Sequence, residues 1–587
     1  MKLNSSSSII SGKIAESRLP LKKTRAEKPE NAELNTSDQV SISGANARGA
    51  RVHTSKEASD SSSSVIKEAR VTDASSPGNE VSSQPRQKES LAPGLVENSN
   101  GSITTFRQVN NITPVSRTAG KDSLGKVFNY IKDSWQTLRR NAAEVASIKD
   151  SKAGMSIIYV PEQDYQKVSQ KMGGNSDSLT IKPLKKGTGF EDVESHGLLY
   201  LPEDYVVPGG RFNEMYGWDS YFTVLGLLQD GETDLAQGMV KNMFYQVDNY
   251  GKVLNANRSY YLSRSSPPFQ SSAVLSVFEK TGDREFLKEG IDHVIKEYNY
   301  WTNPQNEKEM DHLTPTGLSR YYSPVGKPCP EVEEGYYENH NLPTEDPQFC
   351  QHDRAERESG WDMTGRYGYK CADYNPVDLN SYLYKFEKDL ATMYGKLEGK
   401  GSRNAKKWEA KAGHRKALIN KHCWNEEKGM FVDYNFKEGK QSDYNSLATF
   451  APLWAGLASD KQAEKVMENL DKFEMAHGLS TSDNVSDQQW DHPSGWAPLH
   501  ILASKGMRNY GFHQDADRVS TKFMKTIVNN FDENGGILEK YNVEEGTADV
   551  DVGYGNQVGF GWTNAAFLEL HSDMTTKAKL QLKKDYK

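Results

Sequence analysis

The sequence predicts an all-α fold, an (α/α)6 toroid that follows a disordered N-terminal tail. Amphipathic helical patterns repeat from about residue 127 to residue 570, while alternating strand patterns are scarce. The aromatic and charged motifs fall in the Gly-, Pro- and Asn-rich connections between the helical patterns. About ten to twelve helices in series suggest helix pairs arranged in a ring, which gathers its loops at one end over a rigid scaffold.

The composition divides the chain into four segments. Residues 1–115 are rich in Ser, Lys, Glu, Asn and Pro with almost no aromatic residues, so this tail cannot bury enough apolar surface to offset its conformational entropy. Residues 116–190 are expected to form a helical lead-in that packs on the toroid. Residues 191–575 are expected to form the (α/α)6 toroid that carries the aromatic and charged motifs, and residues 576–587 a basic C-terminal tail.

The helices of the ring are expected where apolar residues recur every three to four positions. Such patterns fall at residues 239–247, 272–280, 286–300, 379–393, 446–457, 461–474, 496–507, 516–529 and 562–570.

The charge and the termini exclude several classes of protein. A formal net charge of −8 over 587 residues argues against nucleic acid or anionic membrane as the partner, because both require a basic face. No apolar run reaches the length of a membrane span, and the start lacks a signal-peptide core, so we expect a cytoplasmic protein. The polar, Ser-rich start leaves export by a non-classical or injection-type route as the alternative. The four cysteines form no Cys-x-x-Cys pair, so neither disulfides nor a metal site is expected.

Two carboxylates lie in Gly- and aromatic-rich stretches that do not resemble a solvated helix surface. Asp362 ends the run Arg357-Glu358-Ser359-Gly360-Trp361-Asp362, and Glu539 lies within residues 536–541. Glycoside hydrolysis needs one carboxylic acid to protonate the leaving oxygen and a second carboxylate to attack the sugar or activate a water. We expect Asp362 to be held protonated by partial burial beside Trp361, and Glu539 to be ionised.

Four further clusters surround these acids in the sequence, at residues 208–221, 255–269, 488–498 and 554–564. Aromatic rings suit the C–H faces of a sugar, and Arg, Asp and Asn suit its hydroxyls. Each cluster alone also fits a structural role: buried tryptophans, an ion pair between Arg211 and Asp219, or a Pro-rich turn. Together with the two carboxylates they favour a saccharide site.

Residues 208–221 and 489–498 resemble the two signature motifs of the trehalase family of inverting glycoside hydrolases, and the details are closest to the neutral, cytosolic type. The resemblance implies hydrolysis of α,α-trehalose to two glucose molecules without a cofactor or metal, with Asp362 as general acid and Glu539 as general base. An inverting enzyme keeps its two carboxyl groups roughly 6.5–9.5 Å apart. The residues implied to contact the sugar are Arg211, Phe212, Tyr216, Trp218, Asp219, Asn255, Arg264, Glu331, Gly360 and Trp490.

Two positions depart from the family pattern, which has Gln where this chain has Ser266 and Glu where it has Gly553. Losing a hydrogen-bonding partner for a buried hydroxyl costs about 1–3 kcal/mol, unless Asp551 replaces the missing carboxylate. Two alternatives therefore stay open: a related α-glucosidase with altered specificity, and a catalytically weak sugar-binding or effector protein. The disaccharide is the expected partner, and the sequence does not indicate an oligomeric state.

Overall fold

The computed structural model describes residues 122–141, 156–176, 179–303, 312–333, 335–550 and 553–587, all within the unit Lys88–Lys587. It also gives the backbone of two short antiparallel strands, β1 (Leu95–Glu97) and β2 (Ile103–Thr105). Apart from these strands, the tail expected at residues 1–115 lies outside the described residues, as does Asp551.

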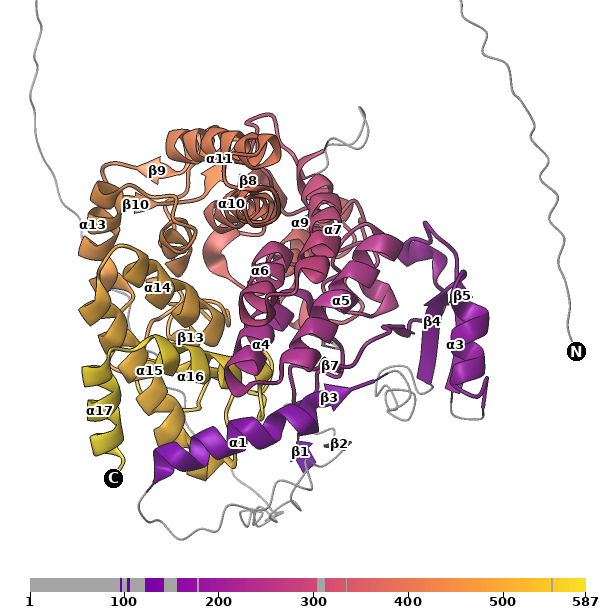
Figure 1. The fold of residues 1–587 in the computed structure, drawn as a ribbon, viewed down its shortest axis with the longest axis horizontal. Helices are drawn as coiled ribbons and strands as arrows, with labels where there is room; N and C mark the ends of the chain where they lie inside the picture. The colour runs from indigo at the N-terminus through magenta and orange to yellow at the C-terminus, as the bar shows by residue number, and fades with distance from the viewer. Residues whose placement is uncertain are drawn as a thin grey trace, which may run out of the picture. The chain divides into compact units, whose positions relative to one another are not determined.

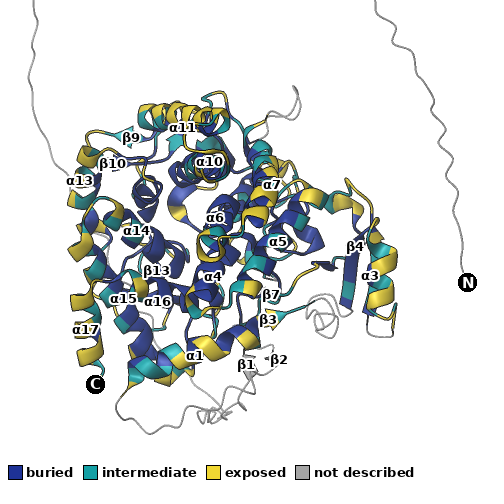
Figure 2. Ribbon diagram, viewed as in Figure 1, coloured by how far each residue is buried: buried dark blue, intermediate teal, exposed yellow. Residues whose placement is uncertain are grey.

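Six helices form a closed inner ring in which each helix contacts the next and the last contacts the first. In chain order they are α4 (Gly217–Asp230), α6 (Gln270–Thr281), α10 (Val377–Glu398), the short α12 (Ala451–Trp454), α14 (Ala497–Asn509) and α16 (Gly561–Asp573). In α16 every residue from Gly561 to Leu570 is buried. Helices that are apolar all round suit a position enclosed by other helices (Figures 1 and 2).

Outer helices pack against this ring and expose polar faces (Figure 2). They are α1 (Ser123–Leu138), α5 (Thr233–Tyr250), α7 (Arg284–Thr302), α11 (Arg403–His422), α13 (Asp460–Glu468) and α15 (His513–Asn534). Helix α5 contacts α4 and α6, α7 contacts α6 and α10, α11 contacts α10, and α15 contacts α14 and α16. This arrangement of inner and outer helices is the predicted (α/α)6 toroid.

Helix α1 lies in the segment expected as a lead-in and packs against α16 and α15 (Figure 1). Its Trp135 is fully buried, and a Cβ atom added at Gly226 of α4 would lie 2.7 Å from Ala565 and 3.1 Å from the Trp135 ring. Glycine and alanine thus allow α4 and α16 to approach closely beneath this tryptophan. The helix therefore covers the junction where the inner ring closes.

The rest of the lead-in contains a small parallel sheet that the sequence patterns do not predict. Strands β4 (Ser156–Pro161) and β5 (Leu179–Leu184) flank α3 (Tyr165–Lys171), and β6 (Leu198–Leu199) pairs with the other edge of β4. At the other end of the chain, the segment expected as a basic tail contains helix α17 (Thr576–Asp585), which packs on α15.

The remaining elements are short and belong to the connections. The strands are β3 (Arg139–Arg140), β7 (Tyr205–Val206), β8 (Tyr374–Asn375), β9 (Trp424–Asn425), β10 (Met430–Phe431), β11 (Tyr434–Asn435), β12 (Lys440–Gln441), β13 (Ser494–Trp496) and β14 (Lys540–Asn542). The helices are α8 (Tyr336–Asn339), α9 (Pro347–Glu358) and the 3-10 turns η1 (Phe190–Asp192), η2 (Ser259–Tyr261), η3 (Gly365–Tyr367), η4 (Cys371–Asp373), η5 (Leu447–Phe450) and η6 (Leu470–Lys472).

The motif loops all come before inner helices. Residues 208–216 lead into α4, 255–269 into α6, 359–376 into α10, 488–496 into α14 and 553–560 into α16. Strands β13 and β14 pair antiparallel, with Trp496 opposite Lys540. The pairing joins the loop before α14 to the segment that carries Glu539.

Candidate active site

Asp362 lies in a strained turn just after α9. Gly360 and Met363 on either side of it have φ values of +73° and +66°, in the left-handed region that residues other than glycine rarely adopt. Glu356 holds this turn, because its Oε1 accepts the backbone N–H groups of Met363 at 3.1 Å and Thr364 at 3.2 Å. The side chain of Asp362 remains 31 % exposed, so the turn presents an accessible carboxyl group.

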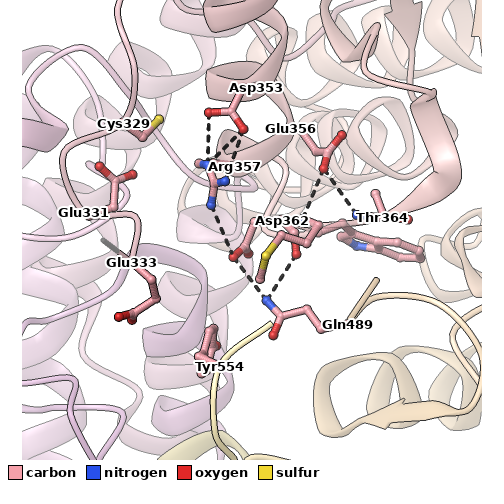
Figure 3. Close-up of polar contacts among 12 residues, drawn as sticks. Cys329, Glu331, Glu333, Asp353, Glu356, Arg357, Asp362, Thr364, Gln489 and Tyr554 are labelled. Atoms are coloured by element: carbon pink, nitrogen blue, oxygen red, sulfur yellow. Dashed lines mark hydrogen bonds and ion pairs between the residues drawn. The ribbon is translucent and has the colours of Figure 1, made fainter. Parts of the chain in front are cut away.

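Two polar side chains, Gln489 and Arg357, lie near the Oδ2 atom of Asp362 (Figure 3). Gln489 Nε2 donates to it at 3.3 Å, and Arg357 Nη1 lies 4.0 Å away. Arg357 is itself held by Asp353, whose two oxygens each lie 3.2 Å from its Nε. Burial raises the pKa of Asp362, and the Arg357 charge opposes this rise. A carboxyl group with a raised pKa suits the role of general acid.

Glu539 precedes β14 and is only 1 % exposed. Its Oε1 accepts a hydrogen bond from Tyr554 Oη at 2.7 Å, and its Oε2 lies 3.6 Å from Lys540 Nζ. Oε2 has no hydrogen-bond donor among the residues that the structure describes. Burial raises the pKa of Glu539, while Lys540 and the Tyr554 hydrogen bond favour its ionised form. Oε2 is thus available to accept a proton.

Gln489 and Lys540 connect the two acids. The amide of Gln489 donates to Asp362, and its Oε1 accepts from Lys540 Nζ at 3.2 Å. Since Lys540 lies beside Glu539, three short contacts join one carboxylate to the other. The charge of Asp362 also raises the pKa of Glu539, which is consistent with two carboxylates in one site. Both acids are predicted from the sequence to be catalytic, and the fold brings them together through these contacts.

The predicted tryptophans lie mainly behind the site. Trp490 is 2 % exposed and stacks on Trp496, with ring centroids 4.0 Å apart, and on Trp361 at 5.6 Å. Trp218 is 5 % exposed and packs at 5.8 Å from Trp490. A Cβ atom at Gly360 would lie 2.8 Å from the Trp218 ring, so only glycine fits beside it. Most of the surface of the Trp490 and Trp218 rings is therefore buried in the protein core, as expected if these tryptophans have a structural role.

Phe212 and Tyr216, the other two aromatic residues predicted to contact the sugar, lie nearer the surface and are half-buried. Phe212 meets the Tyr216 and Tyr554 rings edge-on, with centroids 5.4 Å and 5.8 Å away. The guanidinium of Arg211 lies 4.4 Å from the centroid of Tyr554, the ring whose hydroxyl binds Glu539. Arg211 and Phe212 thus lie close to the Glu539 side of the site.

The predicted charged residues are mostly paired. Arg264 is 1 % exposed and forms an ion pair with Glu331, whose side chain is 13 % exposed. Arg211 forms an ion pair with Glu333, which the sequence analysis does not identify. Asp219 is 6 % exposed, and burial raises its pKa, with further contributions from the charges of Glu539 and Asp362.

Asn255 joins two loops of the site by hydrogen bonds. Its Nδ2 donates to the backbone oxygens of Ser265 at 3.1 Å and Arg357 at 3.3 Å, which ties the loop before α6 to the end of α9. Its contact with sugar, like that of the other nine predicted binding residues, stays a prediction.

The two positions that depart from the family pattern lie at different depths. Ser266 is buried, and its Oγ occupies the space that a Cβ atom at Gly217 would enter, so it packs against the start of α4. Gly553 is exposed and has a φ of +81°; a Cβ atom there would lie 2.7 Å from Met363 Cε and 2.9 Å from Gln489 Oε1. Gly553 therefore borders the contacts that join the two acids.

Sequence reasoning missed the residues that set the environment of the acids: Glu356, Arg357, Gln489, Lys540 and Tyr554. Gln489 precedes the predicted Trp490, and Lys540 follows the predicted Glu539. This adjacency is the signal in the sequence from which these two residues could be identified. In the described part of the chain, no group of three or more His, Cys, Asp or Glu side chains is placed to hold a metal ion, and no helix is long and apolar enough to cross a membrane.

Comparison with known proteins gives one consistent result. Residues 95–574 match the model of the trehalase family. A probable trehalase of Eremothecium gossypii is 40 % identical over 76 % of this chain and 72 % of its own length. A cytosolic neutral trehalase of Saccharomyces cerevisiae is 39 % identical over 78 % of this chain and 72 % of its own. The solved structure of neutral trehalase Nth1 from Saccharomyces cerevisiae matches with a TM-score of 0.68 and 34 % identity, over 79 % of this chain and 96 % of that one.

Proposed function

We propose that this chain, which belongs to the trehalase family, hydrolyses α,α-trehalose to two molecules of glucose with inversion at the attacked carbon. The observation that carries the proposal is the pair of linked carboxyl groups, one with an accessible oxygen beside a strained turn and one buried beside a lysine. Their unlike surroundings suit the unlike roles of acid and base.

Asp362 acts as general acid and Glu539 as general base. Asp362 gives its proton to the glycosidic oxygen as the bond from that oxygen to the anomeric carbon breaks. A water attacks the same carbon from the opposite face, and its proton passes to Glu539. The water oxygen thus forms the new bond with inverted configuration, and the departing sugar keeps its own. Exchange of one proton each with solvent restores the acid and the base.

The oxygens of each acid have separate tasks in this mechanism. Oε1 of Glu539 is occupied by the Tyr554 hydroxyl, so Oε2 takes the proton from water. Oδ2 of Asp362 accepts from Gln489, so the proton for the leaving group resides on Oδ1. Arg211 pairs with Glu333, and we expect sugar hydroxyls to compete for its donors. No cofactor is required for these steps.

The test is an NMR time course of purified protein with trehalose. Inversion yields one α-glucose and one β-glucose at early times, before mutarotation mixes them. Asp362→Asn and Glu539→Gln should each lower kcat by about 10²–10⁴-fold, the usual contribution of general acid–base catalysis. Both variants should still bind trehalose in calorimetry, because the sugar-binding side chains are unchanged. Release of two α-glucose molecules, or of two β-glucose molecules, would contradict inversion.

The second candidate is an α-glucosidase of related mechanism and different specificity. It is favoured by Gly553, which leaves no carboxylate at an exposed position beside Gln489. A panel of α-glucosides assayed beside trehalose separates the two, since a higher kcat/KM for another glucoside would favour this candidate. Equal inactivity of wild type and Asp362→Asn, with trehalose still bound, would favour a sugar-binding or effector protein.

We assign the protein to the cytoplasm, on the ground that relatives from Saccharomyces cerevisiae and Neurospora crassa are named cytosolic neutral trehalases. Fractionation of the source cells tests this assignment, and recovery of the protein outside the cells would support the export route instead.

A further inference from the structure

Lys540 is a fully buried lysine between the two catalytic acids, with 0 % of its side chain exposed. Its Nζ lies 3.6 Å from Glu539 Oε2 and donates to Gln489 Oε1 at 3.2 Å and to the backbone oxygen of Tyr554 at 3.4 Å. The ammonium also lies 4.2 Å from the centroid of the Tyr554 ring. A buried ammonium is costly unless it is paired and hydrogen-bonded, and these groups supply both.

The contact with Lys540 fixes the orientation of Gln489. A glutamine amide has one oxygen, which only accepts, and one nitrogen, which only donates. Because the oxygen faces the Lys540 ammonium, the nitrogen faces Asp362, where it donates to Oδ2 at 3.3 Å and to the backbone oxygen at 3.2 Å. A flipped amide would place its N–H groups against the ammonium and its oxygen against the acid, so it is disfavoured at both ends.

We propose that Lys540 and Gln489 are positioning residues for the hydrolytic reaction, in which Lys540 orients Gln489 so that its amide occupies Oδ2 of Asp362 and leaves Oδ1 to deliver the proton, while the same ammonium keeps Glu539 a carboxylate. This inference rests on the proposed function. It adds a physical connection between the two acids, since one cation serves both.

The other charged groups near Glu539 do not duplicate this role. Tyr554 donates to Oε1, the Arg211 charge lowers the pKa of Glu539, and Asp362 raises it. Arg211 is engaged by Glu333, and arginine does not titrate in the relevant range. Among the residues that the structure describes, Lys540 is the one basic side chain that forms an ion pair within 4 Å of the Glu539 carboxylate.

Three basic side chains lower the pKa of Asp362. Arg357 has the largest effect in lowering the pKa of Asp362, followed by Arg264 and Lys540. Burial raises the pKa of Asp219, and the charges of Glu539 and Asp362 raise it further. Replacing Gln489 by Met therefore leaves these charges in place. It removes the two hydrogen bonds that the amide donates to Asp362, at Oδ2 and at the backbone oxygen, and the one that it accepts from Lys540.

The experiment measures the titration of the two carboxyl groups directly. Protein labelled with ¹³C at Asp and Glu side-chain carboxyls is titrated by NMR, with Asp362→Asn and Glu539→Gln used for assignment. Lys540→Met should raise the midpoints of both carboxyls, and that of Glu539 by about one pH unit or more, because an opposite charge at this distance is lost. Gln489→Met should raise the midpoint of Asp362 alone, since Lys540 still faces Glu539.

The same variants are assayed for hydrolysis as a function of pH. In Lys540→Met both limbs of the kcat/KM profile should move to higher pH; in Gln489→Met the alkaline limb alone should move, with kcat reduced at least tenfold. Lys505→Met is the matched control, because Lys505 Nζ lies 2.8 Å from both Glu569 and Asp573, away from the acids. It should leave both midpoints unchanged.

Unchanged carboxyl titrations in folded Lys540→Met and Gln489→Met would overturn the proposal, even if both variants lost activity. If Lys540→Met fails to fold by circular dichroism, Gln489→Met still decides, because its shift must be confined to Asp362. Failure of the proposed function has a different signature: wild-type protein that does not hydrolyse trehalose while both titrations shift as expected.

Discussion

Glu356 offers the sharpest test of how the turn around Asp362 is held. Its Oε1 is the acceptor for the N–H groups of Met363 and Thr364, so Glu356→Ala leaves two buried donors unsatisfied. Each costs about 1–3 kcal/mol. The positive φ of Met363 then lacks its restraint, and displacement of Asp362 by about 1 Å should lower kcat roughly a hundredfold.

Glu356→Gln is the matched variant, because it keeps Oε1 as acceptor and removes the ionisable group. Its kcat should stay close to that of the wild type. The two substitutions together separate the geometric role of Glu356 from its charge.

The charge has its own measurable effect on stability. Burial raises the pKa of Glu356 from 4.5 to about 8. Between these values the folded protein retains a proton that the unfolded chain has lost, so the free energy of unfolding falls as pH rises and becomes level above about pH 8. At about 1.4 kcal/mol per pH unit, the gap from 4.5 to about 8 corresponds to about 5 kcal/mol at most. Glu356→Gln lacks this proton and should lose this part of the pH dependence.

Urea unfolding of wild type and Glu356→Gln, run side by side from about pH 5 to pH 8, measures the difference. The variant should gain stability relative to the wild type with every step upward in pH. Parallel curves for the two proteins, or an unchanged kcat in folded Glu356→Ala, would refute the reasoning.

Three further substitutions test a hydrogen bond, a backbone conformation and a buried cation. Tyr554→Phe removes a 2.7 Å hydrogen bond that favours ionised Glu539, so the acid limb of kcat/KM should move up by about 0.7 pH unit, and an unmoved limb would contradict the assignment. Gly360→Ala should lose about 1–3 kcal/mol of stability in urea unfolding, because its φ is +73°, whereas Gly401→Ala, in open space, should not; equal effects would be inconsistent with strain. Arg366→Met leaves two buried aspartates without their cation and should cost about 3–5 kcal/mol by the same measurement, so a loss below 1 kcal/mol would count against it.

The sequence predicts the helices because they have strong periodic or wholly apolar patterns, which do not depend on distant residues. The ring is suggested only by the number of helices in series and by the motifs in their connections. Helix α1 shows the limit of such patterns. Its helical character is readable at Ser134 to Leu138, but its position over α4 and α16 depends on partners about ninety and more than four hundred residues away. The parallel strands β4 and β5 are short and lie beside one small helix, so their pattern is too weak to identify alone.

At the site, motif recognition locates the loops, while packing decides which of their side chains contact the two acids. In Gln489-Trp490 the sequence favours the tryptophan as the binding residue, yet Trp490 stacks in the core and Gln489 contacts the acid. The pairing of β13 with β14 sets Lys540 opposite Trp496 and thus toward Gln489. Such cross-strand contacts are not encoded in local composition.

Closure of the helix ring has a consequence for how the protein matures. The loop before α4 supplies Arg211, while Glu539 and Tyr554 come from the last helix pair, more than three hundred residues later. Closure of the ring around them brings α16 against α4, a contact of high sequence separation that can form only after nearly the whole chain has been synthesised. A ribosome-bound chain that has not yet released α16 therefore cannot close the ring, and Arg211 meets the Tyr554 ring only as synthesis ends.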